Sequence, residues 1–206
     1  MPNGDSVAIA VLAKAPIAGM AKTRLIPSIG AHAAAVLQER LTERTVETAV
    51  AADIGPVTVW CAPDLMQTRF QDLAAQFPIV LKQQPDGDLG KRMLGALAAA
   101  QGPVLVIGTD CPAFTAEILR AAAKALQQAD VVLVPAEDGG YVLIGARAVH
   151  PELFSGIAWG TAAVMAETRA RIAALGLNAA ELPALWDVDS EEDLARCERM
   201  FPEMAL

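Results

Sequence analysis

Short segments that are apolar at every position alternate along the chain with longer alanine-rich segments in which polar residues recur. The first pattern is typical of a strand covered on both faces of a sheet, and the second of an amphipathic helix. The predicted strands are residues 7–13, 57–60, 79–81 and 104–107. The predicted helices are residues 31–52, 64–76, 91–100, 116–128 and 161–175, and Thr115 is expected to cap the helix that starts at residue 116. This alternation is typical of βαβ units and predicts an α/β fold with a largely parallel sheet.

Residues 131–135 and 141–145 predict two further strands on either side of Glu137-Asp138-Gly139-Gly140. This connection is too short for a crossover, so an antiparallel hairpin is expected and the sheet is predicted to be mixed. A last helix should follow Asp187-Val188-Asp189, because Ser190 and Asp193 have the spacing of a capping box. No linker or repeat interrupts the pattern, so residues 1–206 are expected to form a single domain.

Composition excludes several classes of protein. With 54% hydrophobic and 19% charged residues the chain is not a disordered polymer. No uncharged apolar run reaches the ~18 residues needed to cross a bilayer, so no membrane span is expected. Three widely spaced cysteines fit neither a disulfide framework nor a zinc site, which favours the reducing cytoplasm.

The net charge of −8 argues against a nucleic-acid partner, because binding phosphate backbones requires a basic face. The distribution of the charges adds a more specific indication. Residues 6–38 contain no Asp or Glu, yet Lys14, Lys22 and Arg24 all fall there. A basic segment in an acidic protein predicts a local anion site.

The basic segment includes the loop of residues 14–30, which leaves the carboxyl end of the first predicted strand. Open α/β sheets bind ligands at this end of their strands. Gly19 allows close approach of the backbone, and Lys22 and Arg24 are suited to clamp phosphate oxygens. The loop is neither G-x-G-x-x-G nor a Walker loop, which argues against simple dinucleotide and P-loop folds. The alternative is a surface loop whose basic residues are merely solvated.

Two acidic positions are candidate metal ligands. Asp110 directly follows a buried strand, and a carboxylate there suits Mg²⁺, which fills its remaining positions with phosphate and water. The alternative is that Asp110 caps a turn ahead of Pro112. Asp189 offers a second carboxylate, although an acid near a helix start is also stabilising by itself.

The predicted hairpin loop has the position and length of an acceptor-binding rim. Gly139, Gly140 and Tyr141 would form it together with Trp159, although the glycines also suit a plain turn and a Trp is more often packing. Asp88 is a candidate contact for a nucleobase or ribose, and equally fits a loop that leads into a helix. The two histidines are isolated in sequence, so no Ser-His-Asp or Cys-His arrangement is indicated.

Four motifs together resemble the DUF2064 family of the nucleotide-diphospho-sugar transferase superfamily. They are Leu12-Ala-Lys-Ala-Pro-x-x-Gly-x-x-Lys-Thr-Arg-Leu25, Gly108-Thr-Asp-Cys-Pro112, Asp138-Gly-Gly-Tyr141 and Asp187-Val-Asp-Ser-x-x-Asp-Leu194. The resemblance covers nearly the whole chain and extends to 2-phospholactate guanylyltransferase and, more distantly, molybdenum cofactor guanylyltransferase. It implies a three-layer GT-A (Rossmann-like) sandwich with a mostly parallel mixed sheet.

The resemblance also implies an activity: a transferase that uses a nucleoside triphosphate or nucleotide sugar with a small-molecule acceptor. The implied phosphate-binding loop runs from Lys14 to Arg24 and includes Gly19, Lys22 and Thr23. Ala13 and Asp88 are further candidate nucleotide-binding residues. Asp110 would hold Mg²⁺ or Mn²⁺ with Asp189, and Lys22, Arg24 and Asp110 would be catalytic. Asp138 is a candidate base if a sugar is transferred.

Glycosyl and nucleotidyl transfer both stay open. Gly108 stands where many glycosyltransferases have the first acid of Asp-x-Asp, whereas the family is usually described as glycosyltransferases. A hypothesis from another class, a non-catalytic nucleotide-binding or scaffold domain, predicts binding without turnover. A homodimer is also open, because alanine-rich helix faces pack within or between subunits.

Overall fold

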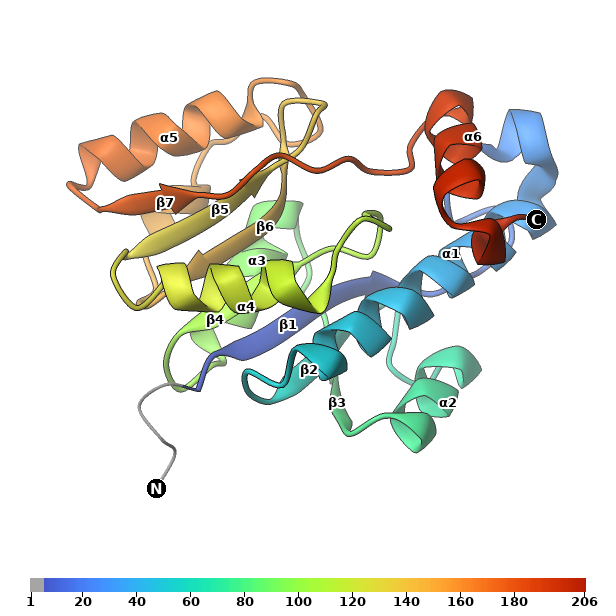
Figure 1. The fold of residues 1–206 in the computed structure, drawn as a ribbon, viewed down its shortest axis with the longest axis horizontal. Coiled ribbons are helices and arrows are strands. Elements are labelled where there is room, and N and C mark those ends of the chain that lie inside the picture. Colours follow the sequence, from blue (N-terminus) through green and yellow to red (C-terminus); the bar gives the residue numbers. More distant parts are fainter. Residues whose placement is uncertain (1–5) are drawn as a thin grey trace.

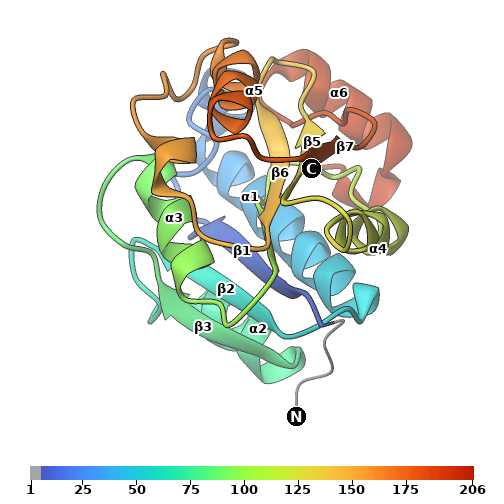
Figure 2. The same cartoon turned by 90° about the vertical axis from the view of Figure 1, so that its left-hand side faces the viewer.

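The computed structural model describes residues 6–206 and shows one sheet covered by helices (Figures 1 and 2). The strands are β1 (Ala8–Lys14), β2 (Val57–Ala62), β3 (Ile79–Gln83), β4 (Val104–Ile107), β5 (Val131–Pro135), β6 (Tyr141–Ala146) and β7 (Ala179–Glu181). The α helices are α1 (Ile26–Ala52), α2 (Thr68–Gln76), α3 (Leu89–Ala98), α4 (Ala116–Ala125), α5 (Val164–Ala174) and α6 (Glu191–Met200). Two short 3-10 helices, η1 (Pro151–Phe154) and η2 (Pro202–Met204), complete the elements.

The sheet has the strand order β3-β2-β1-β4-β6-β5-β7. Neighbouring strands are parallel except where β6 pairs, antiparallel, with β4 and β5. The predicted mostly parallel mixed sheet and the predicted β5–β6 hairpin are therefore confirmed. Because β6 runs against its neighbours, its first residues lie at the edge where β1 and β4 end. Leu143 of β6 pairs with Ile107, the last residue of β4.

Three layers follow from which face each helix covers. The apolar residues of α1, α2 and α4 pack on one face against alternate positions of β1, such as Ile9 and Val11. Those of α3, α5 and η1 pack on the other face, where Ala10 points. Figure 2 shows the two sets of helices on opposite sides of the sheet. The three-layer α/β/α sandwich expected from the sequence is thus confirmed.

A third apolar cluster packs the C-terminal segment against α1. Leu37 and Leu41 of α1 are buried against Leu194 and Cys197 of α6, together with Trp186 and Val188. Figure 1 shows α6 and the C-terminus beside the start of α1, with the chain crossing over from β7. This packing brings residues 186–189 to the carboxyl edge of the sheet.

Several element boundaries differ from those predicted. Helix α1 begins at Ile26 with an additional helical turn; the backbone kinks at Gly30 (φ 81°), and the helix continues from Ala31, the predicted start. Helix α2 begins at Thr68, since Asp64 accepts the Met66 N–H and holds the preceding residues in a turn. The sequence missed β7, η1 and η2, which are three or four residues long. The Thr115 cap and the capping box of α6 are confirmed.

None of the helices in residues 6–206 combines the length and apolar character that a bilayer-spanning segment requires.

Candidate functional site

A cleft of about 400 Å³ opens at the carboxyl edge of the sheet, where β1 and β4 end. Its lining comes from the ends of β1, β2 and β4, the β1–α1 loop, the turn after β4, the start of β6 and the first half of α3, together with Gln38, Gln84, Asp187 and Asp189. The predicted site residues in its lining are Ala13, Lys14, Lys22, Thr23, Arg24, Asp110, Tyr141 and Asp189. Residues far apart in sequence and predicted separately thus share one cleft.

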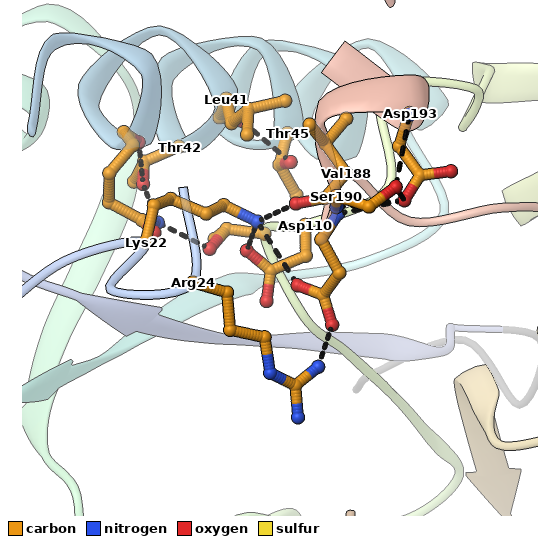
Figure 3. A network of polar contacts seen from close by, with 12 residues as sticks. Lys22, Arg24, Leu41, Thr42, Thr45, Asp110, Val188, Ser190 and Asp193 are labelled. Carbon is orange, nitrogen blue, oxygen red and sulfur yellow. Dashed lines mark hydrogen bonds and ion pairs between the residues drawn. The ribbon is translucent and has the colours of Figure 1, made fainter. Parts of the chain in front are cut away.

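Lys22 lies at the centre of this arrangement. Its Nζ contacts Asp110 Oδ1, lies 3.9 Å from Asp189 Oδ1 and donates a hydrogen bond of 2.7 Å to the Val188 carbonyl (Figure 3). Its side chain is only 4% exposed. The backbone of Lys22 has a φ of 46°, which is uncommon for a residue other than glycine and often marks a functional constraint.

The two candidate metal ligands are brought together by backbone pairing. The Val188 N–H donates a 2.9 Å hydrogen bond to the Asp110 carbonyl, which fixes residues 187–189 beside the turn after β4. Both carboxylates stay about half exposed, 48% for Asp110 and 44% for Asp189. Arg24 covers Asp189 from outside through a 2.8 Å ion pair. Both carboxylates are therefore accessible from the cleft.

A third carboxylate, Asp187, lies in the same cleft and was not among the predicted site residues. Burial, and then the negative charge of Asp110, raise its pKa to about 7. The sequence carried a signal for it. Val188 is apolar and fully buried, and it stands between Asp187 and Asp189. In an extended segment successive side chains alternate in direction, so these two aspartates lie on one face and Val188 lies on the other.

The raised pKa of Asp187 predicts a pH-dependent stability in the presence of a chelator. A group that holds its proton more tightly when folded stabilises the protein below its unfolded pKa, near 3.8, and this stabilisation is lost as pH rises through about 7. Asp187→Asn should remove this slope and make the protein more stable than wild type at pH 8 by about 1–3 kcal/mol. Urea unfolding between pH 4.5 and 8 measures the free energy of unfolding of both proteins. If this free energy changes with pH in the same way in both, the prediction is contradicted.

The wall of the cleft beside β1 and β2 is built around Gln84, which the sequence did not indicate. The buried amide nitrogen of Gln84 donates to the carbonyls of Ala13 (2.9 Å) and Trp60 (2.8 Å), where β1 and β2 end. Its oxygen accepts a 3.4 Å hydrogen bond from Arg92, whose Nε also donates to Gly87. Arg92 thereby joins Lys14 as a second basic residue in this part of the lining.

A second buried glutamine supports the turn that carries Asp110. Gln38 of α1 donates a 2.9 Å hydrogen bond to the hydroxyl of Thr109, and both side chains are buried. The turn after β4 is thus held by α1 on one side and by residues 187–189 on the other. The Asp110 side chain lines the cleft and contacts Lys22.

Other predicted residues lie outside the cleft lining: Gly19, Asp88, Asp138, Gly139, Gly140 and Trp159. Asp88 is the N-cap of α3, where its side chain accepts the Lys91 N–H at 2.9 Å. Trp159 packs edge-on against Tyr141, with ring centroids 6.5 Å apart. These contacts match the structural alternatives left open by the sequence, and the binding roles of Asp88 and Trp159 stay predictions.

Asp138 of the hairpin loop acts on the carboxylates of the cleft through its charge. Asp138 accepts the Gly140 N–H at 2.9 Å, which forms the turn, and its side chain is exposed. Its negative charge also contributes to the raised pKa of Asp187. Asp138 is thus close enough to influence the site, while its role as a base stays a prediction.

The metal assignment can be tested against the donor groups. Within residues 6–206 no group of three or more His, Cys, Asp or Glu side chains is arranged to hold a metal ion by itself. Asp110 and Asp189 nevertheless converge on one cation, the Lys22 ammonium. One or two carboxylates are what Mg²⁺ commonly takes from a protein when a substrate phosphate and water supply the rest. The residues present therefore fit a metal that binds together with a phosphate.

Comparison with known proteins places the chain in a family. Residues 45–161 match the family described as "Uncharacterized protein conserved in bacteria (DUF2064)". This protein belongs to the DUF2064 family. It is 30% identical to a protein from Desulfovibrio desulfuricans G20 named "putative nucleotide-diphospho-sugar transferase", with a TM-score of 0.86 over 96% of this chain and 88% of that chain. A search of curated proteins finds no match.

More distant structures share the fold of this DUF2064 protein. CMP:2-keto-3-deoxy-manno-octonic acid synthetase, solved with CTP, is 11% identical with a TM-score of 0.63, over 97% of this chain and 100% of that chain. The Mycobacterium tuberculosis H37Rv protein Rv0371C, solved with manganese, is 13% identical with a TM-score of 0.59, over 93% and 97%. At such identities the likeness concerns the fold alone, and it confirms the predicted GT-A-like architecture.

Proposed function

We propose that this DUF2064 protein is a divalent-metal-dependent transferase that uses a nucleoside triphosphate or nucleotide sugar as donor. The observation that carries the proposal is the convergence of Lys22, Asp110 and Asp189 in one cleft at the carboxyl edge of the sheet. Cations that bind phosphate and carboxylates that hold a metal recur at sites of phosphoryl transfer. The name of the Desulfovibrio relative, a nucleotide-diphospho-sugar transferase, supports the same class.

Asp110 and Asp189 would hold the divalent ion, Mg²⁺ or Mn²⁺, and the manganese complex of a distant relative supports this choice. When bound, such an ion neutralises charge on the phosphates of the donor. Lys22 and Arg24 would bind phosphate oxygens from the β1–α1 loop. Ala13 and Lys14 at the end of β1, and Gly19 and Thr23 of the β1–α1 loop, would surround the donor.

Nucleotidyl transfer is the form of the reaction that we favour. An oxygen of the acceptor, such as a phosphate oxygen, attacks the α-phosphorus of a nucleoside triphosphate; the bond to the β-phosphate oxygen breaks and pyrophosphate leaves. Lys22 and Arg24 would stabilise charge on the departing diphosphate. Gly108 in place of the first acid of Asp-x-Asp supports this choice, as does the CTP complex of a structural neighbour.

Glycosyl transfer is a second candidate, favoured by the name of the Desulfovibrio relative. The same residues would then stabilise a nucleoside diphosphate as it leaves the sugar. Asp138 would take the proton of the acceptor hydroxyl, and the loop of Gly139, Gly140 and Tyr141 with Trp159 would bind the acceptor. Because the described helices pack around one sheet, we propose that residues 1–206 act as one domain in either case.

A thermal-shift panel tests the proposal and separates the donors. Nucleoside triphosphates and nucleotide sugars are each added with Mg²⁺ and with a chelator. The correct donor, at about a hundred times its Kd, should raise Tm by about 5–10 °C with the metal and much less without it. Release of pyrophosphate or of nucleoside diphosphate then distinguishes the two reactions. Binding without turnover for any acceptor phosphate or sugar would favour a non-catalytic nucleotide-binding domain, and no shift with any nucleotide would exclude the donor site.

A further inference from the structure

The position between Asp110 and Asp189 is held by the chain itself. Lys22 Nζ contacts one carboxylate, lies 3.9 Å from the other and is anchored by the Val188 carbonyl at 2.7 Å (Figure 3). The carboxylates are about half exposed, whereas the lysine side chain is almost completely buried. An ammonium group thus lies on the inner side of the carboxylates that we assign to the metal.

The electrostatics of the cleft explain why a cation is needed there. Asp187, Asp110 and Asp189 all line one cleft, and the Lys22 ammonium contacts Asp110 and lies 3.9 Å from Asp189 Oδ1. Arg24 contributes less to the interior, because its side chain is 68% exposed and pairs with Asp189 from outside. Closely spaced carboxylates repel one another, and one buried cation relieves this repulsion.

We propose that Lys22 is an internal counter-ion that occupies the metal-binding carboxylates in the ligand-free protein and competes with the divalent ion for them. The inference rests on the proposed function, because it takes Asp110 and Asp189 as the metal ligands. Lysine suits this role since its ammonium is a compact charge on a flexible stem. Lys22 leaves the carboxylates when the ion binds and finds a new partner in a phosphate of the donor.

This exchange couples the two ligands. Without a nucleotide, the displaced ammonium has no anionic partner inside the cleft, so a divalent ion alone binds weakly. With a nucleotide, the phosphate receives Lys22 and the carboxylates receive the ion. Metal and donor therefore bind cooperatively, and each raises the affinity for the other by the same factor.

Calorimetric titration with Mn²⁺ alone measures the competition directly. Lys22→Met keeps the apolar stem and removes the charge, so it should bind Mn²⁺ on the order of tenfold more tightly than wild type. Arg24→Met is the matched control: it removes the same charge from the same loop and from the same Asp189, but outside the buried position. It should change the affinity by less than about threefold. An equal or weaker affinity in folded Lys22→Met overturns the proposal.

A measurement on the wild-type protein covers the case in which Lys22→Met does not fold. Reductive methylation followed by peptide mass spectrometry compares Lys22 with Lys14, which is exposed in the same cleft. Without metal, Lys22 should react at least about tenfold more slowly than Lys14, because it is buried and paired. Mg²⁺ should raise the ratio of the Lys22 rate to the Lys14 rate, and Mg²⁺ with the nucleotide should lower this ratio again. A ratio that stays constant across all Mg²⁺ concentrations overturns the proposal.

The same titrations separate this inference from the proposed function. If wild type binds Mn²⁺, Asp110→Asn abolishes that binding and Lys22→Met leaves it unchanged, the metal site stands and the counter-ion role fails. If wild type and Lys22→Met both bind no Mn²⁺, with or without nucleotide, the metal assignment itself fails, and the inference fails with it.

Discussion

Replacing Asp110 by asparagine is expected to lower turnover by about a thousandfold or more while leaving the protein folded. The side chain ends the turn after β4 and faces the cleft, where its carboxylate contacts Lys22 and would hold the metal. Asparagine keeps the shape of the side chain and removes the negative charge that the Lys22 ammonium and the metal ion both require. The loss should be in kcat/KM and, since charge develops in the transition state, also in kcat.

Stability distinguishes a catalytic defect from an unfolded variant. Asp110→Asn loses a contact with Lys22 but also relieves repulsion with Asp187, so its free energy of unfolding should change by no more than about 1 kcal/mol. Asp72→Asn is the control, because Asp72 lies on α2, pairs with Arg69 and does not line the cleft. It should keep the turnover of wild type. Turnover within tenfold of wild type in Asp110→Asn would contradict the metal assignment.

Replacing Gly139 by alanine is expected to destabilise the protein by about 2–4 kcal/mol. Gly139 has a φ of 92°, which side chains rarely adopt, and an added Cβ would lie 2.5 Å from the Ala162 carbonyl oxygen and 2.8 Å from its Cα. Backbone atoms cannot move aside by changing rotamer, so the hairpin loop or the segment ahead of α5 must shift. The Gly139 carbonyl also accepts the Met165 N–H at 2.9 Å, which ties the two segments together.

Gly176→Ala separates the backbone cost from the collision. Gly176 also has a positive φ, 65°, but an added Cβ would meet no atom within 4 Å. Its replacement should cost about 1 kcal/mol, and the excess in Gly139→Ala measures the collision with Ala162. Urea unfolding of the three proteins gives the difference. An equal loss of unfolding free energy in the two variants would show that the hairpin loop shifts without cost and would contradict the prediction.

The sequence by itself determined the elements whose signals are local. Residues 7–13 and 104–107 are apolar throughout, which only strands covered on both faces require, and these became β1 and β4. Capping by Thr115 and by Ser190 with Asp193 was also readable, because a cap is a hydrogen bond within a few residues. The basic loop and the acid after β4 follow from the rule that parallel strands end at one edge.

Only the tertiary structure decided how the site is completed. Asp110 meets residues 187–189 because Trp186 and Val188 are buried against α1 and α6, and no local pattern specifies that long-range packing. Likewise, Gln84 holds Arg92 in the cleft through hydrogen bonds to strand ends more than twenty residues away. Caps and periodic patterns depend only on residues that are close in sequence. The partner of a buried charge instead depends on which distant segments the hydrophobic core brings together.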